Sequence, residues 1–187
     1  MAGNRRIGLN SYTVQEATSK IASSRIVRVT PTVIAGETAD NDVMFDATEI
    51  PNAVLQPGGT SKLVGITIID KDGERHDFDV IFMQVQTNFG TADSATTITD
   101  ASLQAAKVTG ALSIDWSDGE VFFAQNSGDA AIFCATLGTG TSSNHSLTQM
   151  LQAEEGSTSV YFTGIAQGAA IDYAATDDLE FVFHIDY

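Results

Sequence analysis

Several residue types are scarce in this chain of 187 residues. A single cysteine, Cys134, excludes an internal disulfide and the cysteine clusters of structural zinc sites and iron–sulfur clusters. No run of about 18 apolar residues is present, so we expect no membrane-spanning helix, and the first residues lack the apolar segment of a secretory signal. Because 43% of the residues are hydrophobic and the mean hydropathy is +0.02, the chain is too apolar to be disordered. The sequence therefore predicts a globular domain that depends on its core for stability.

Basic residues are also scarce, and they are unevenly distributed. Residues 1–30 contain five basic residues and one carboxylate, a net charge of +4. From residue 31 onward four basic residues face 23 carboxylates, a net charge of −19, and no lysine or arginine follows Lys107. Such an acidic body repels phosphate groups and anionic lipids, so we expect neither nucleic acid nor a membrane as a partner. The acidity itself is typical of a highly soluble protein.

Apolar and polar residues alternate over many short segments past residue 25, and this period of two predicts β-strands. The expected strands are 25–30, 63–69, 78–85, 108–114, 121–124, 131–137, 160–166 and 179–187, with 43–50 as a further candidate. In the last strand Phe181, Phe183, Ile185 and Tyr187 should face one way, and Val182, His184 and Asp186 the other, as in a half-buried strand. We predict an all-β fold, an antiparallel β-sandwich for which a jelly-roll is one arrangement.

Little of the chain has the pattern of a helix. Only residues 100–107 combine an N-cap residue, Asp100, with good helix formers, while residues 146–155 have a helix-like composition between loop-like segments. Residues 1–24 follow neither period and are expected to form an extended N-terminal arm, so the predicted organisation is an arm at 1–24 and a β-sandwich domain at 25–187. The Thr-, Ser- and Gly-rich stretches 86–99 and 136–146 are predicted to be long surface loops.

The turn around Asp72-Gly73 lies between two predicted strands, and glycine supplies the positive φ of a short hairpin loop. The sequence therefore predicts a hairpin of 63–69 with 78–85. Carboxylates surround this turn, namely Asp70, Asp72, Glu74, Asp77 and Asp79. The segment begins like a calcium loop but lacks its later ligands, so a solvated turn is the preferred interpretation and no metal is expected.

No motif points to catalysis or to a cofactor. The histidines His76, His145 and His184 are isolated in sequence, without the spacing that brings two ligands to one metal. Cys134 lies in an apolar strand and is expected to be buried and inert. Trp116 lies at an acidic turn, where its ring would either close the edge of the sandwich or stack on a sugar. We expect no catalytic residue, no cofactor and no enzymatic activity.

Six segments, in order, carry a family resemblance. They are Ile26-Val-Arg-Val-Thr-Pro-Thr-Val, Val43-Met-Phe, Gly59-Thr-Ser-Lys-Leu-Val-Gly-Ile-Thr-Ile-Ile-Asp-Lys, Asp77–Phe82, Gly156-Ser-Thr-Ser-Val-Tyr-Phe and Tyr173-Ala-Ala-Thr-Asp-Asp-Leu-Glu-Phe. Over residues 25–187 this pattern resembles a group of small proteins encoded in marine phage genomes beside the head genes. The resemblance implies a virion structural protein of the capsid decoration (cement) type, located on the outer capsid surface and in the host cytoplasm before assembly.

The expected partner is then the major capsid protein, bound by a homotrimer of this chain. An acidic shell surface would be contacted by the basic residues of the N-terminal part, Arg5, Arg6, Lys20, Arg25 and Arg28. Two alternatives stay open: a tail, neck or baseplate component of the virion, and a carbohydrate-binding module that stacks sugars on Trp116, Tyr161 or Tyr173.

Overall fold

The computed structural model describes residues 24–117, 120–122, 130–138, 148–168 and 170–187. Nearly all its regular structure is β. The strands are β1 (Ser24–Val29), β2 (Gly36–Thr38), β3 (Val43–Ile50), β4 (Thr60–Asp70), β5 (Phe78–Met83), β6 (Val108–Ile114), β7 (Glu120–Phe122), β8 (Ala131–Thr136), β9 (Gln149–Gln152), β10 (Val160–Ala166), β11 (Ile171–Tyr173) and β12 (Leu179–Asp186). One helix, α2 (Asp100–Ala106), lies among the described residues, and no described helix has the length and apolar character to cross a membrane.

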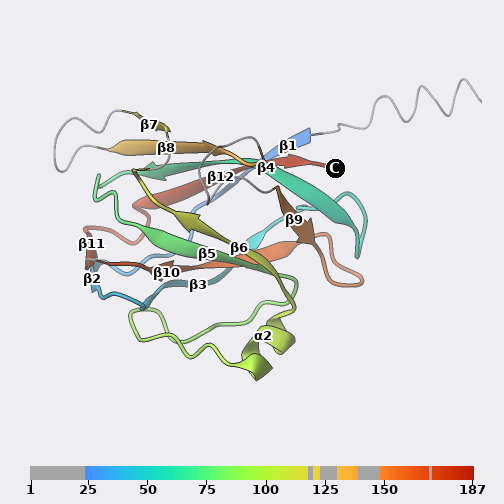
Figure 1. Ribbon diagram of the computed structural model, residues 1–187, viewed down its shortest axis with the longest axis horizontal. Coiled ribbons are helices and arrows are strands. Elements are labelled where there is room, and N and C mark those ends of the chain that lie inside the picture. The colour runs from blue at the N-terminus through green and yellow to red at the C-terminus, as the bar shows by residue number, and fades with distance from the viewer. Residues whose placement is uncertain (1–23, 118–119, 123–129, 139–147, 169) are drawn as a thin grey trace, which may run out of the picture.

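The strands form two antiparallel sheets that face each other (Figure 1). The larger sheet has the order β1-β12-β4-β8-β7, with β9 pairing the beginning of β4, and the smaller sheet has the order β3-β10-β5-β6. A two-stranded ribbon of β2 and β11 lies at one end of the sandwich. The predicted all-β antiparallel sandwich is therefore confirmed.

The eight main strands pair from the outside of the chain inward. The first of them, β1, pairs with the last, β12, and β3 pairs with β10. Nearer the middle of the chain, β4 pairs with β8, and β5 pairs with β6. Successive pairs of this series therefore lie in opposite sheets: β1–β12 and β4–β8 in the larger sheet, β3–β10 and β5–β6 in the smaller one.

The predicted hairpin of 63–69 with 78–85 is wrong. The turn at Gly73 is present and has the expected positive φ of 74°, but β4 belongs to the larger sheet and β5 to the smaller one. The turn therefore carries the chain from one sheet to the other. A short loop with a glycine fits both connections, and only partners distant in sequence decide between them, because β4 pairs with β12 and β8.

Other expectations differ in detail. The helix begins after Thr99 rather than Asp100, because the Thr99 hydroxyl accepts the Ser102 backbone N–H and so caps the first turn. The helix-like segment 146–155 contains a strand, β9, and the sequence did not predict β2 or β11. These short strands carry too few residues for their period to be recognised.

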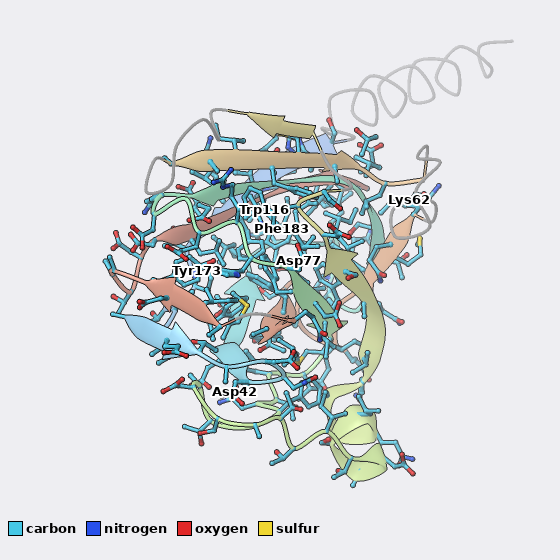
Figure 2. The ribbon with its side chains drawn as sticks, turned by 60° about the vertical axis from the view of Figure 1, so that its left-hand side comes forward. Asp42, Lys62, Asp77, Trp116, Tyr173 and Phe183 are labelled. Atoms are coloured by element: carbon cyan, nitrogen blue, oxygen red, sulfur yellow. The ribbon has the colours of Figure 1, made fainter. Side chains whose placement is uncertain are left out.

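Phenylalanines from both sheets fill the space between them. Seven of them are fully buried, namely Phe45, Phe78, Phe82, Phe133, Phe162, Phe181 and Phe183. Phe162 of the smaller sheet lies 5.0 Å, between ring centroids, from each of Phe181 and Phe183 of the larger sheet, in edge-to-face geometry. Such pairs add about 0.5–1.5 kcal/mol each to the free energy gained from burying the rings. The two sheets are therefore joined through an aromatic core, in which Phe183 is labelled in Figure 2.

Candidate functional site

One end of the sandwich is strongly acidic. The described residues of four segments meet there, 30–42, 71–77, 115–117 and 167–178 without 169. They are joined by backbone contacts such as Val33 N–H to Thr176 O and Lys71 N–H to Asp178 O. Together they carry ten carboxylates against Lys71 and Arg75. The carboxylates are Glu37, Asp40, Asp42, Asp72, Glu74, Asp77, Asp115, Asp172, Asp177 and Asp178. We call this the acidic end.

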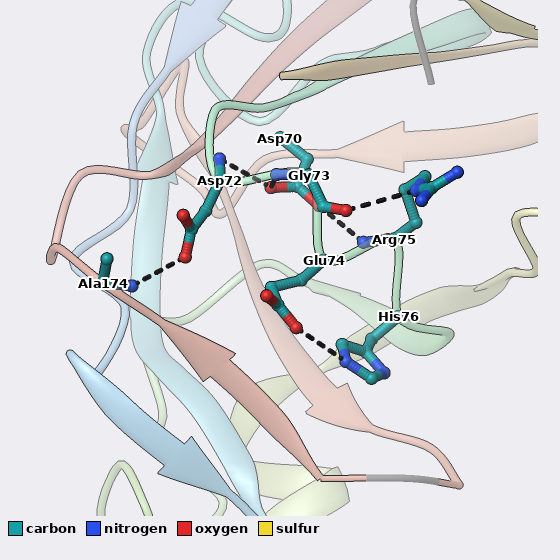
Figure 3. A network of polar contacts seen from close by, with 7 residues as sticks. All are labelled: Asp70, Asp72, Gly73, Glu74, Arg75, His76 and Ala174. Atoms are coloured by element: carbon teal, nitrogen blue, oxygen red, sulfur yellow. Dashed lines mark hydrogen bonds and ion pairs between the residues drawn. The ribbon is translucent and has the colours of Figure 1, made fainter. Parts of the chain in front are cut away.

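Asp70 organises the turn at the acidic end (Figure 3). It closes β4 with no exposed surface, and its Oδ1 accepts the backbone N–H groups of Asp72 at 3.1 Å and Gly73 at 2.9 Å. Its Oδ2 accepts the Arg75 N–H at 2.7 Å. The neighbouring Asp72 carboxylate reaches across to the Ala174 N–H at 2.9 Å. These bonds fix the crossing from one sheet to the other and tie it to the loop before β12.

Burial raises the pKa of Asp70 above its usual value of 3.8, although the three backbone donors oppose that rise. The pKa of Tyr173 is raised well above 10.0, first by burial and then by the nearby carboxylates of Asp70 and Glu74. Both groups therefore favour their neutral forms more than they would in water. The main cause is burial, to which the charges of neighbouring carboxylates add.

The carboxylates of the acidic end do not converge on a common point. Asp77 accepts the Trp116 backbone N–H at 3.0 Å, and Asp79 accepts the Gln167 side-chain amide at 3.2 Å. Over the described ranges, no three His, Cys, Asp or Glu side chains come together in a way that would hold a metal ion. Several carboxylates instead accept hydrogen bonds from neighbouring segments, as Asp72 does from the Ala174 N–H and Asp77 from the Trp116 N–H.

The opposite end of the sandwich is where β1 begins and β12 ends, and we call it the arm end. Its described segments 51–59, 97–107, 137–138 and 148–159 carry three carboxylates, of which Glu154 pairs with Lys107 at 2.9 Å. The loop 89–96 returns to the acidic end, where the Asp93 N–H donates to Val43 O at 2.8 Å. Ser24, assigned to the arm from the sequence, is the first residue of β1 and pairs with Asp186. The basic arm therefore joins the body at the end that lacks the dense cluster of carboxylates.

Two of the predicted contact residues lie in β1, at the edge of the larger sheet. Arg28 donates to Glu180 at 2.6 Å, so its charge is already paired within the chain. Arg25 is exposed and, within the described part of the chain, makes neither an ion pair nor a side-chain hydrogen bond. The other three predicted residues, Arg5, Arg6 and Lys20, lie outside the described residues. Arg25 is thus the described member of the set that is available to a partner.

The expectation of a buried Cys134 is wrong. Its neighbours Ala131 and Phe133 point into the core, so the alternation of β8 turns Cys134 to the outer face, where it is partly exposed. Its Sγ lies 3.5 Å from Thr67 Oγ1, which is also 3.3 Å from His184 Nε2. The threonine hydroxyl thus separates the thiol from the imidazole, and the two do not form a nucleophile–base pair.

The two described histidines lie in different segments of the chain. His184 lies on the polar face of the last strand, as predicted. His76 contacts Glu74, with 3.2 Å between Nε2 and Oε2, beside the turn of the acidic end. His145 lies outside the described residues.

The aromatic residues considered for sugar binding are mostly buried. Trp116, labelled in Figure 2, is 8% exposed and lies 5.4 Å from Phe133 between ring centroids, so it is part of the core. Tyr173 is 3% exposed, and Tyr161 packs against the second apolar cluster around Met83 and Phe89. These rings offer no open, coplanar platform, so the structure gives no support to the sugar-stacking alternative.

The sequence matches no model of a protein family, and no curated protein matches it. The site is therefore described by its own geometry, an acidic end and an arm end on one sandwich.

Proposed function

We propose that the protein is a decoration (cement) protein of a phage capsid, attached through its arm end to the major capsid protein on the outer surface of the head. The observation that carries this proposal is the polarity of charge. Residues 1–30, with a net charge of +4, join the sandwich at the arm end, and the ten carboxylates of the acidic end lie at the other. A protein with such a dipole is oriented by an acidic surface, with its basic end toward that surface.

We infer further that the sandwich is a jelly-roll. Its eight main strands, numbered in chain order, pair as first with eighth, second with seventh, third with sixth and fourth with fifth. A long hairpin rolled into two four-stranded layers has this pairing, and the jelly-roll recurs in viral capsid domains and in lectins. Fold alone does not fix function, so this inference adds to the charge polarity and does not replace it.

A role in a shell also agrees with what the described residues lack. They hold no metal-binding cluster, and Asp77 and Trp116, which the sequence singled out, serve a turn and the packing of the core. A stable β-core with one chemically distinct end is sufficient for a protein that binds a large assembly. We propose that it acts there as a homotrimer, since decoration of a shell commonly follows the local symmetry of its subunits.

The test is binding to heads of the phage that encodes the protein, purified without it. Full-length chain and a variant with Arg5→Gln, Arg6→Gln and Lys20→Gln are added, and the bound protein is measured after sedimentation. Exposed charge pairs contribute about 0.2–1 kcal/mol each, so the triple variant should bind about threefold to a hundredfold more weakly. Binding of the unchanged protein should fall with salt, because charges at this surface are screened.

A matched pair of single substitutions separates the two ends. Arg25→Gln at the arm end should weaken binding, whereas Lys71→Gln at the acidic end removes the same charge and should leave it unchanged. Equal binding of the original protein, both single variants and the triple variant would overturn the attachment through the arm end. Binding to purified tails but not to heads would favour the tail or neck alternative. A cryo-EM map of decorated heads then reads the copy number and tests the trimer.

A further inference from the structure

The outer face of the larger sheet contains a groove that crosses four strands. Two adjoining hollows of about 380 Å³ each form it, and they share Val64 and His184. One hollow extends over β4 and β8 to Cys134 and Thr136, and the other extends to the beginning of β1 at Ser24. The groove therefore runs from the edge of the sheet, where the described chain begins, to its middle.

The register of the strands explains the groove. Ile26, His184, Gly65 and Thr136 lie directly opposite one another on β1, β12, β4 and β8. Gly65 lacks a side chain, and a Cβ there would lie 3.3 Å from the Ala135 carbonyl oxygen and 3.6 Å from His184 Cβ. The missing side chain leaves a depression in the middle of this row.

The edge of the groove is apolar. Ile26, which forms its β1 side, is 62% exposed and is the most exposed of the large apolar side chains in the described residues. Val64 adds a second, half-buried apolar side chain, shared by both hollows. An exposed isoleucine beside a hollow with apolar lining marks a surface that gains free energy when a further apolar side chain covers it.

We propose that this groove is the docking site for the N-terminal segment of the same chain, with Ile21 over His184 and the residues before it over Gly65. The segment joins the body at Ser24, which itself lines the groove. His184 pairs with Ile26, so it lies one strand spacing across and two residues along from Ser24, about 8 Å away. Ile21 precedes Ser24 by three residues, and an extended chain covers about 10 Å over that length. Attachment at the edge of the groove also gives the segment a high effective concentration there.

The arrangement places charge on the outside. In an extended segment successive side chains alternate, so Lys20 points away from the sheet when Ile21 points into the hollow. Docking would thereby place the positive charge of Lys20 on the outer face of the larger sheet, beside the arm end. Docking in the groove does not require a capsid, so its test is independent of the proposed function.

The single thiol of the chain reports on the groove. Cys134 lines the hollow beside Gly65, and its rate of reaction with DTNB (5,5′-dithiobis-2-nitrobenzoate) measures how often that hollow is open. In the full chain the reaction should be slow. Ile21→Asp should accelerate it about tenfold or more, because the rate of a covered thiol follows the population in which it is uncovered. Ile26→Asp should also accelerate it by removing the apolar edge.

Two matched substitutions act as controls. Gln15→Asp introduces the same charge elsewhere in the N-terminal segment, and Ile98→Asp introduces it at an exposed isoleucine of the 86–99 loop, which does not line the groove. Both should leave the rate within about twofold of the original, a free-energy difference too small to indicate a lost contact. Circular dichroism checks that every variant keeps its β-structure.

The outcomes separate the possible occupants. A rate that is the same in the original protein and in Ile21→Asp overturns the proposal. A slow rate that becomes fast on dilution also overturns it, since the covering segment then comes from a second copy. Protection that persists on dilution and at high salt supports the docking of the chain's own segment through apolar contact. If this result is positive while the heads bind no protein, only the proposed function fails.

Discussion

The two faces of β12 differ although they belong to the same eight residues. On the inner face Phe181, Phe183 and Ile185 are fully buried, and the two phenylalanines contact aromatic rings of the opposite sheet. On the outer face His184 is partly exposed, and its ring contacts only a threonine hydroxyl among the side chains described. The neighbouring strands β4 and β8 repeat this contrast, with Ile68 and Phe133 inside and Thr67 and Cys134 outside.

The contrast teaches where stability and binding can be separated in this fold. Side chains that join the two sheets have no exposed surface and cannot contact a partner without unfolding. Side chains on the outer face line a groove, and changes there remove few internal contacts. Substitutions on the inner face should therefore lower the free energy of unfolding much more than substitutions on the outer face.

The largest effect is expected from Phe183→Ala. Phe183 lies 5.0 Å from Phe162 and 6.2 Å from Phe82 between ring centroids, so its loss leaves a cavity between the sheets. The free energy of unfolding should fall by about 3–5 kcal/mol. His184→Ala, the adjacent residue on the outer face, loses one hydrogen bond and should cost about 1 kcal/mol or less. Urea denaturation of both variants measures the difference, and equal losses would break the comparison of the two faces.

A second effect concerns Asp70, the charged exception among the described buried residues. Since burial raises its pKa in the folded state, the folded protein binds this proton more tightly than the unfolded chain does. The resulting stability is present below pH 3.8 and is lost as pH rises through the raised folded pKa. Asp70→Asn does not titrate, so the unfolding free energy of the original protein minus that of the variant should decrease over this window. A difference that is constant with pH would show that burial does not dominate at Asp70.

The smallest effect is expected at the exposed ion pair of the sheet edge. Arg28 and Glu180 are 2.6 Å apart, and the arginine side chain is 63% exposed, so solvent screens their attraction. Arg28→Gln should lower the unfolding free energy by at most about 1 kcal/mol. The loss should vanish when thermal unfolding is repeated at high salt. A larger or salt-independent loss would mean that the outer face contributes more to stability than its exposure indicates.

Much of the strand content could be predicted because alternation is a local signal. The expected strand at 108–114 coincides with β6, and that at 160–166 coincides with β10. The same signal does not give the orientation of Cys134, because a strand that is apolar on both faces does not indicate which face is buried. The pairing of Asp70 with backbone donors was also missed, because its carboxylate looked like one of several in a solvated turn.

The candidate site was predictable only in its charge. The excess of basic residues before residue 31 and of carboxylates after it can be counted in the sequence. The pairing of Arg28 with Glu180, which leaves Arg25 as the available cation of β1, depends on two residues 152 positions apart. The groove likewise depends on Gly65 lying opposite both His184 and Thr136, and no local pattern could indicate this.

The sequence by itself determined that the chain folds as β-strands around a core of aromatic residues, because the period of two and the side-chain volumes are properties of neighbouring residues. Only the tertiary structure decided which strands share a sheet. The turn at Gly73 is compatible with a hairpin and with a crossing between sheets, and the choice follows from burying Phe78 and Ile68 on facing layers while β4 pairs with β12. Such long-range pairings are favourable only once the chain has closed large loops, so they are fixed by the whole core and not by any one segment.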